Sequence, residues 1–510
     1  MASLTHAAGE RKAVPRPGPR AVVRDSVAVA VGGQLERALG TITAFALRWG
    51  LEPASLGVYT GLRLYLDNTN RSSLGVGLGA VQEIPVLLAE GRDAEARLVS
   101  DVAYTTNTLT CLVYAAALVA VALFWAPGAS TDPVGAEWKW GLAAVAGLAL
   151  IKRYETFLVA VLRARGAFTL TAELDVVESL ASAVAVSLGL WLAGFWGLLA
   201  AVGVLLLAKI AYAHARHPLR FRFAWDGPTA WRLMRVGLPI LANTAAFGAV
   251  QGLDRALILG RVPDGARAVG LYSIALMGTG WALDLAGRLV LVSYNAFQTT
   301  LGRTADPREV ARQSLRATEA QAPILLAGSA VAYLVGPAFL GWAMPKYVDG
   351  LPALRPLLPG MIFLGLAWPA RQMLIAVGRP YRLFAATLAG LLCAGACGVV
   401  GADRAGIVGV AWAMSIGYAA VFLLTSGAAV VPLLGPRAWA GHVGRVGLTI
   451  AGFTSVVLFV AHTPLPFFQA ERWALAVRCV LLTAWLVPTL WVWARRNDWG
   501  GYRGPLRRTG

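Results

Sequence analysis

Three ionisable residues stand at helical spacing within an apolar stretch of the N-terminal half. Arg63, Asp67 and Arg71 follow one another at intervals of four residues, which places all three along one face of a continuous helix. Polar residues 68–70 come directly after Asp67 and indicate that the middle of this helix is hydrated. We expect Arg63 and Arg71 to bind an anionic substrate, and Asp67 to bind a coupling ion or to form an ion pair.

A second set of ionisable residues lies in the C-terminal half. Asp284 and Arg288 are also four residues apart and therefore share a helix face. We expect Arg288 to bind substrate and Asp284 to serve in coupling or in an ion pair. Arg37 and Arg255, which each follow an acidic residue directly, are the next candidates for substrate binding. The alternative for these arginines is a set of salt bridges between the two halves, without ligand contact.

An acidic cluster begins a helix near residue 168. Glu173, Asp175 and Glu178 lie within six residues, and Glu178 is a candidate for coupling or for an ion pair. The alternative is that acidic side chains stabilise the helix by their interaction with its dipole.

The amino-acid composition indicates the environment that surrounds these residues. Of the 510 residues, 57% are hydrophobic and 14% are charged, against roughly 25% charged residues in soluble domains. Four cysteines are too few for a disulfide scaffold, and the apolar content excludes a disordered chain. What remains is an all-α polytopic membrane protein, whose spans each need about 20 mainly apolar residues. Ionisable residues inside such spans are costly and mark functional sites by default.

The apolar runs recur at near-regular spacing and predict about fourteen transmembrane helices. The predicted ranges are 27–49, 54–89, 98–126, 137–162, 168–191, 194–215, 236–260, 268–300, 312–343, 350–377, 381–401, 405–432, 440–461 and 472–494. The second and the eighth exceed 30 residues, so we expect each to be broken, tilted or extended beyond the bilayer.

The charge distribution predicts the orientation of these helices. The net charge is +18, but the basic residues stand between apolar runs and do not indicate a nucleic-acid partner. With fourteen spans, 31 of the 45 Lys and Arg residues fall on the side of the termini and seven on the opposite side. The positive-inside rule therefore places both termini in the cytoplasm.

Two short sequence patterns recur at a shared offset and indicate an internal repeat. Residues 56–60 (LGVYT) resemble 269–273 (VGLYS), and residues 193–197 (AGFWG) resemble 405–409 (AGIVG). An even number of spans separates the copies, so two six-helix lobes should be related by a pseudo-twofold axis along the membrane normal. The offset of 213 places Arg71 at the position of Asp284, on the opposite lobe.

The repeat divides the chain into five segments. We expect a disordered cytoplasmic tail over 1–24, an N-terminal six-helix lobe over 25–222, a C-terminal six-helix lobe over 223–432, two additional helices over 433–495 and a basic cytoplasmic tail over 496–510.

These motifs resemble a known superfamily. Gly237-Leu238-Pro239, Gly378-Arg379-Pro380 and Gly406-x-x-Gly409-Val410-Ala411 accompany the repeated patterns. Over about residues 25–432 the chain resembles a polysaccharide-export flippase of the multidrug/oligosaccharidyl-lipid/polysaccharide exporter superfamily. One departure is Gln298, which stands where the repeat projects Pro85 and where such flippases often have a proline.

The resemblance implies a transporter that moves a polyprenyl-diphosphate-linked oligosaccharide across a bacterial cytoplasmic membrane by alternating access, with cavity arginines on the diphosphate. Membrane lipids, envelope glycosyltransferases or a polymerase would be its partners in polysaccharide biosynthesis. No catalytic residue, cofactor or metal is expected. The alternatives are a cation-coupled multidrug antiporter of the same fold, a polyprenyl-linked membrane glycosyltransferase or polymerase, and a scaffold for envelope assembly.

Overall fold

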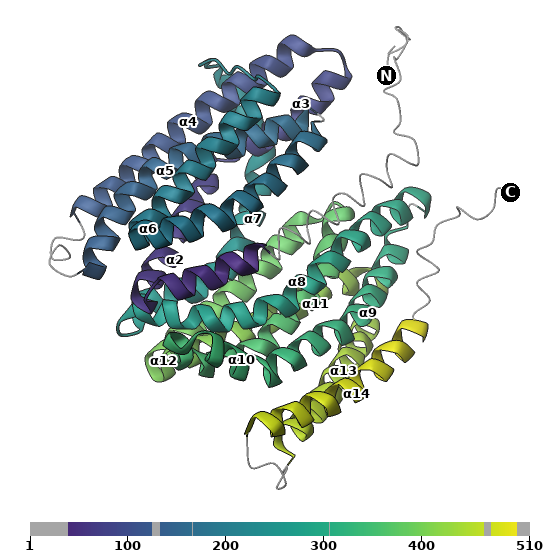
Figure 1. Ribbon diagram of the computed structural model, residues 1–510. Helices are drawn as coiled ribbons and strands as arrows, with labels where there is room; N and C mark the ends of the chain where they lie inside the picture. Colours follow the sequence, from purple (N-terminus) through teal and green to yellow (C-terminus); the bar gives the residue numbers. More distant parts are fainter. Residues whose placement is uncertain (1–38, 125–132, 166, 305, 464–470, 497–510) are drawn as a thin grey trace.

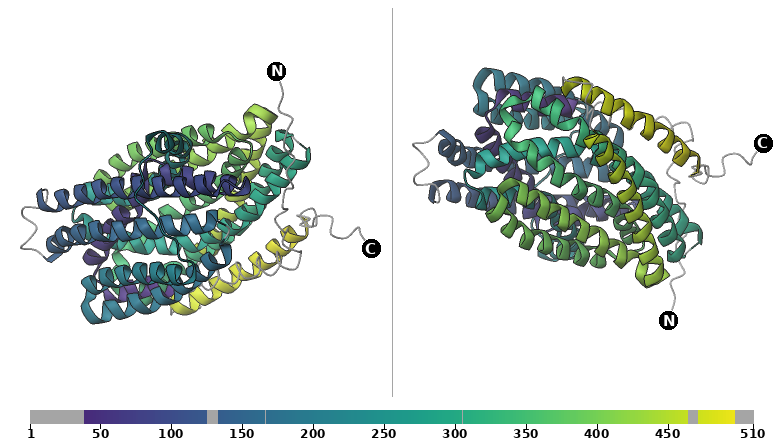
Figure 2. Two further views of the ribbon diagram at one scale, coloured as in Figure 1. Left: turned by 90° about the horizontal axis from the view of Figure 1, so that it is seen from above. Right: turned by 90° about the horizontal axis from the view of Figure 1, so that it is seen from below.

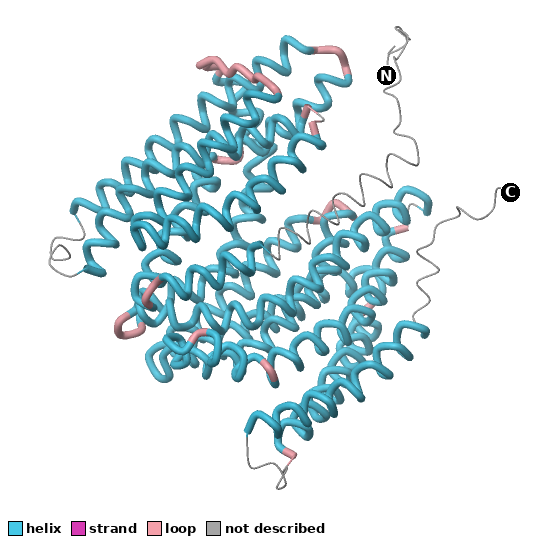
Figure 3. Tube along the Cα trace, viewed as in Figure 1, coloured by secondary structure: helices cyan, strands magenta, loops and turns pink. Residues whose placement is uncertain are grey.

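The computed structural model describes residues 39–124, 133–165, 167–304, 306–463 and 471–496, and these residues are almost entirely helical (Figure 3). The predicted tails over 1–24 and 496–510 lie outside them except for residue 496. A helix over residues 39–50 comes first. The other elements are α2 (Pro53–Asn68), η1 (Thr69–Ser73), α3 (Val76–Ala89), α4 (Asp93–Phe124), α5 (Pro133–Ala164), α6 (Phe168–Arg216), α7 (Gly227–Arg261), α8 (Gly265–Thr304), α9 (Pro307–Leu334), α10 (Gly336–Ala343), η2 (Pro345–Ala353), α11 (Leu354–Ala376), α12 (Pro380–Leu434), α13 (Pro436–His462) and α14 (Glu471–Arg496).

The predicted all-α fold is confirmed, and the described elements group into fourteen helical segments in the predicted order. The second segment is broken, because η1 and the left-handed residues Leu74 and Gly75 interrupt it. The ninth segment bends by 51° between α9 and α10. The eighth is one continuous helix of 40 residues, although Gln298 replaces the projected proline. Six described helices are long and apolar enough to cross a membrane, or seven with the bent α9–α10 pair.

The outside of the helical bundle carries large apolar side chains. Phe124 and Trp191 are each 81% exposed, and Leu448 is 76% exposed. Such exposure would be costly in water and suits contact with lipid chains.

The backbone repeats its conformation at an offset of 212 residues. Ala193 and Gly194 interrupt α6 with φ/ψ of −145°/22° and 53°/−130°. Ala405 and Gly406 interrupt α12 with φ/ψ of −140°/17° and 54°/−133°. The positive φ at the second position favours glycine, which has no Cβ to clash. Each long helix is therefore two helices joined by the same tight turn.

The contact between α2 and α8 has the symmetry that the repeat predicts. A Cβ on Gly57 would lie 1.6 Å from the carbonyl oxygen of Ala266, and a Cβ on Gly270 would lie 1.7 Å from that of Pro53. The offset of 213 exchanges Gly57 with Gly270 and Pro53 with Ala266. The two backbones therefore cross at a pseudo-twofold axis, in contact that only glycine permits.

Replacement of this interface glycine by valine should destabilise the protein. In Gly270→Val the new side chain meets backbone atoms that cannot rotate away, and overpacking of this kind typically costs about 1–3 kcal/mol. Gly280→Val is the matched control on the same helix, because a Cβ there meets nothing within 4 Å. Thermal melting of the two purified variants checks the expectation. Equal melting temperatures would contradict the close crossing of α2 and α8.

Two groups of helices make up the molecule (Figure 1). α3, α4, α5 and α6 lie together in one group, which we call the N-terminal group, whereas α8, α9, α11 and α12 lie together in the other, the C-terminal group. α7 packs on α3 and also on α12, so it contacts both groups. α13 and α14 pack on α9, at the edge of the second group (Figure 2).

Candidate functional site

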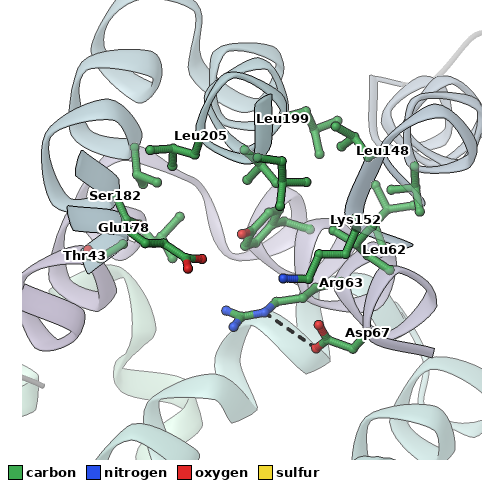
Figure 4. A pocket seen from close by; sticks show the side chains of 17 residues that line it. Thr43, Leu62, Arg63, Asp67, Leu148, Lys152, Glu178, Ser182, Leu199 and Leu205 are labelled. Carbon is green, nitrogen blue, oxygen red and sulfur yellow. Dashed lines mark ion pairs between the residues drawn. The ribbon is translucent and has the colours of Figure 1, made fainter. Parts of the chain in front are cut away.

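A cavity of about 200 Å³ lies between α5 and α6 of the N-terminal group, α2 and the helix over 39–50 (Figure 4). Leucine and valine side chains form much of its wall. Its polar lining residues are Thr43, Tyr59, Arg63, Asp67, Lys152, Glu178 and Ser182. Three of the residues that the sequence predicted, Arg63, Asp67 and Glu178, thus line one cavity.

Arg63 and Asp67 form the ion pair that their spacing predicts. The guanidinium Nε lies 3.7 Å from a carboxylate oxygen, and both side chains are 62% exposed. Figure 4 shows both side chains beside the cavity, with Glu178 on the other side of Arg63. An exposed pair of this kind contributes little to stability and leaves the guanidinium with hydrogen-bond donors for a ligand.

Arg71 does not share the face of Arg63 and Asp67, contrary to the sequence expectation. The helix changes at Thr69 into the 3₁₀ turn η1, which has about three residues per turn instead of 3.6. Arg71 therefore does not line the cavity with Arg63 and instead extends towards α7. Its Nη2 atom would be 2.1 Å from a Cβ on Gly248, so only glycine leaves room for the guanidinium.

Arg71 makes no hydrogen bond or ion pair with a described residue. The predicted partner Asp284 and the candidate Arg288 belong to α8. The structure describes their backbone but not their side chains. Arg37 precedes the described residues. The expected arrangement of Arg71 opposite Asp284 therefore stays a prediction.

Arg371 also contacts α7 and was missed by the sequence analysis. Its guanidinium carbon lies 3.6 Å from the centre of the Phe247 ring, next to Gly248. Arg371 belongs to α11, within the predicted span over 350–377, and was not named among the candidates. It is the only charged residue between Arg355 and Arg379, and that isolation in an apolar run was the available signal.

The break in the second segment is held by a buried arginine. Arg153 of α5 is only 7% exposed. It donates to the backbone oxygen and the side-chain oxygen of Asn70, at 3.2 and 3.3 Å, and to the side-chain oxygen of Asn107 at 2.6 Å. Peptide groups at a helix break lack their usual partners, and Arg153 supplies one. This residue fixes η1 and hence the place from which Arg71 extends.

A buried ion network connects α5 and α6 below the cavity. Lys209, 9% exposed, lies 2.9 Å from Glu155, which is 4% exposed, and it also pairs with Glu178. Lys152 lies 3.0 Å from Glu155, and Arg163 pairs with Asp175 at 3.2 Å. The acidic cluster of α6 thus forms side-chain ion pairs as well as lying early in its helix. Of the six residues in this network, Lys152 and Glu178 also line the cavity.

Arg255 of α7 follows Asp254 directly, and the carboxylate of Asp254 is buried. Asp254, 1% exposed, accepts a hydrogen bond of 2.7 Å from the backbone N–H of Arg255. Tyr272 and Tyr418, buried beside it, come from α8 and α12. The Nε atom of Arg255 is buried and has no hydrogen-bond partner in the described part of the chain. No group of three or more metal-ligating side chains occurs among the described residues.

One end of the molecule joins the two halves through polar contacts. We call it the outer end, after the charge prediction, and it contains the connections 51–52, 262–264 and 344–353. Arg48 donates to the carbonyl of Ser273 at 2.8 Å, and Tyr347 donates to that of Leu51 at 2.9 Å. Lys346 pairs with Glu52 at 2.5 Å. The halves are closed against each other at this end.

No protein-family model and no curated protein matches the sequence, but solved structures match the fold. A structure described as lipid II flippase MurJ in an inward closed conformation is 11% identical, with a TM-score of 0.66, and the match covers 92% of this chain and 99% of that chain. An inward-facing multidrug resistance MATE family transporter of the MOP superfamily is 14% identical, with a TM-score of 0.59 and coverage of 82% and 99%. At these identities the likeness establishes a shared fold.

A third structure differs in the character of its binding pocket. It is described as a MOP superfamily transporter from Pyrococcus furiosus Vc1 (DSM3638) whose reverse polarity of binding pocket suggests a different function. It is 14% identical, with a TM-score of 0.54, and the match covers 84% of this chain and 96% of that chain. These similarities agree with the predicted all-α fold.

Proposed function

We propose that the chain is a transporter that moves a polyprenyl-diphosphate-linked oligosaccharide, or a polysaccharide repeat unit, across a bacterial cytoplasmic membrane. The observation that carries this proposal is the guanidinium of Arg71, which lies against α7 with no acidic partner among the described residues. α7 contacts both halves of the molecule, and Arg371 lies on the adjacent Phe247. Two arginines from opposite halves therefore converge on one helix.

Arginine suits the polar part of such a substrate. Its planar fork of donors binds phosphate oxygens in pairs and keeps its charge at any accessible pH. A diphosphate moving through a low-dielectric protein needs its charge balanced along the path, and free cations supply that balance. Arg63 remains in the proposed substrate site. Its Nε pairs with the exposed Asp67, and the other guanidinium donors remain available to a ligand. Arg255, Arg288 and Arg37 remain candidates.

Alternating access follows from the way in which the halves meet. The contacts at the outer end, from Arg48, Tyr347 and Lys346, would have to open for release on that side. We propose that both termini face the cytoplasm, that membrane lipids surround the bundle, and that envelope glycosyltransferases or a polymerase use the product. No residue is assigned a catalytic role.

A cation-coupled multidrug antiporter is the second candidate. Its support is the cavity of the N-terminal group, where Asp67 and Glu178 place two carboxylates next to the aromatic ring of Tyr59. Both carboxylates already have cationic partners, Arg63 and Lys209. An organic cation would have to displace those partners, which makes this candidate weaker.

Binding of the isolated polar group tests the proposal. A soluble short-chain prenyl diphosphate should bind to the purified full-length protein, and Arg71→Gln should weaken binding about tenfold or more, because hydrogen bonds between charged groups contribute about 1.5–3 kcal/mol. Arg261→Gln, which removes a surface pair with Asp403 at the outer end, is the matched control. Tight binding of ethidium without binding of the diphosphate would favour the antiporter instead.

A further inference from the structure

A second cavity lies at the inner end of the N-terminal group, the end opposite the outer end. It has a volume of about 510 Å³ and forms between the start of α4, the end of α5 and the loop over 217–226 that follows α6. Four arginines line it, together with one carboxylate: Arg97, Arg165, Arg220, Arg222 and Asp101. We call it the arginine cavity. None of its lining residues also lines the cavity around Arg63.

The wall of the arginine cavity is fixed by contacts of the loop with α4. The backbone N–H of Arg222 donates to Asp101 at 3.0 Å, and that of Ala224 donates to the hydroxyl of Thr105 at 2.9 Å. Phe221 stacks on Tyr104, with ring centres 5.5 Å apart. The backbone of the loop is therefore fixed before any ligand binds, which lowers the entropic cost of binding.

The charges in the arginine cavity are only partly balanced by nearby carboxylates. None of the four guanidinium groups forms an ion pair with a described residue. The one carboxylate, Asp101, already accepts from the backbone of Arg222. The Nε atom of Arg165 is buried and has no hydrogen-bond partner among the described residues. Burial first, and the charge of Arg97 next, lower the pKa of Arg165, and the nearby carboxylates of Asp101 and Asp93 offset this shift only in part.

Aromatic side chains beside the arginine cavity indicate how it meets its surroundings. Phe223 is 68% exposed and Trp225 is 67% exposed, and both follow the cavity-lining residues of the loop directly. Aromatic residues of this kind gather at the boundary between lipid and water. The cavity therefore opens close to the level of lipid headgroups, where anionic phosphates are abundant on the cytoplasmic side.

We propose that the arginine cavity binds a phosphate group of a net-anionic molecule, separately from the transported substrate. Four guanidinium groups offer paired donors to phosphate oxygens, and the single carboxylate leaves the site strongly cationic. The phosphate can belong to an anionic phospholipid, which the flanking Phe223 and Trp225 favour, or to a soluble ion. The proposal does not depend on the function proposed above.

The test compares two double variants of the full-length protein. Arg97→Gln/Arg222→Gln removes two exposed arginines from the cavity, and Arg379→Gln/Arg382→Gln removes the same charge before and at the start of α12. Neither change disturbs an ion pair with a described residue. Each protein is reconstituted in phosphatidylcholine nanodiscs that contain a minor fraction of phosphatidylglycerol, and bound lipid is counted by native mass spectrometry. Equilibrium dialysis with radiolabelled inorganic phosphate forms the second arm.

The lipid source predicts that wild type and the α12 variant retain phosphatidylglycerol, whereas the cavity variant retains about tenfold less. The soluble source predicts the same ranking for inorganic phosphate in the dialysis arm. Either result supports the proposal and identifies the source. Equal retention by the two variants in the first arm, together with equal or absent phosphate binding in the second, would overturn it. Arg220→Gln is the substitute if the cavity variant does not accumulate.

Discussion

Arg71→Ala should abolish the ability of the gene to complement a flippase-deficient strain, while the protein still inserts and accumulates. The reason is that Arg71 forms no ion pair or hydrogen bond with a described residue, so its removal leaves no buried charge without a partner. Its loss would remove a bidentate contact to phosphate. Arg71→Lys should restore function only in part, because an ammonium is a point charge without the planar fork. Complementation is measured beside protein abundance in the membrane fraction.

The predicted pairing of Arg71 with Asp284 makes a different prediction. If the two form a buried ion pair, Arg71→Ala would lower abundance, because an unpaired buried charge costs about 3–5 kcal/mol. Arg71→Ala/Asp284→Ala would then recover both abundance and activity. Recovery of activity in the double variant would show that Arg71 is structural. Arg261→Ala serves as the control for loss of one arginine from an exposed pair.

Gly248 offers an independent test of where Arg71 acts. A Cβ at this position would lie 2.1 Å from Nη2 of Arg71, so Gly248→Ala must displace the guanidinium while leaving its charge in the protein. We expect reduced complementation at normal abundance. Gly252→Ala, one turn further along α7 and with only Leu64 at 3.4 Å, should function normally. Equal activity of these two variants would contradict a role for the position of Arg71.

Lys209→Met should cause the largest loss of stability among single substitutions in the ion network. Lys209 and Glu155 are 9% and 4% exposed and lie 2.9 Å apart. Removal of one partner from a buried pair typically costs about 3–5 kcal/mol, and this is the upper bound here because Glu155 keeps its pair with Lys152. Glu178 loses its partner in the same step. The measurement is the free energy of unfolding, or the melting temperature, of the purified protein.

Two further variants distinguish the charge contribution of the Lys209–Glu155 pair from the packing contribution of the lysine side chain. Lys152→Met removes the more exposed cation, 27% exposed, and leaves Glu155 with Lys209, so its cost should be closer to 1 kcal/mol. Lys209→Met/Glu155→Gln should recover part of the loss, because the carboxylate no longer needs a partner. A double variant as unstable as Lys209→Met alone would mean that the lysine acts through packing rather than charge.

The sequence predicted those features that depend on local pattern. The helices followed from apolar runs. The repeat followed from two pairs of five-residue patterns, and in one pair the backbone angles at Ala193–Gly194 agree with those at Ala405–Gly406. The Arg63–Asp67 pair followed from a spacing of four residues. Each of these depends on neighbours along the chain, which a sequence displays directly.

Features that depend on distant partners were not predicted. Arg153 holds Asn70 across 83 positions, and the arginine cavity joins α4, α5 and the loop after α6. Arg71 was placed on the face of Arg63 because nothing in the residue spacing reveals that η1 replaces the helix at Thr69. That turn is held by tertiary contacts from α5, so its position is a property of the packed molecule.

The most direct test of the proposed function is transport by the purified protein in vesicles. A fluorescent polyprenyl-diphosphate oligosaccharide is placed in both leaflets of phosphatidylcholine vesicles, and an enzyme outside modifies the accessible sugar. With wild-type protein nearly all of the substrate should become modified, whereas Arg71→Ala vesicles should stop at about half, the share of the outer leaflet in a bilayer that does not exchange lipids. Wild-type vesicles that also stop at half, while the same protein drives ethidium out against a cation gradient, would contradict a lipid-linked substrate.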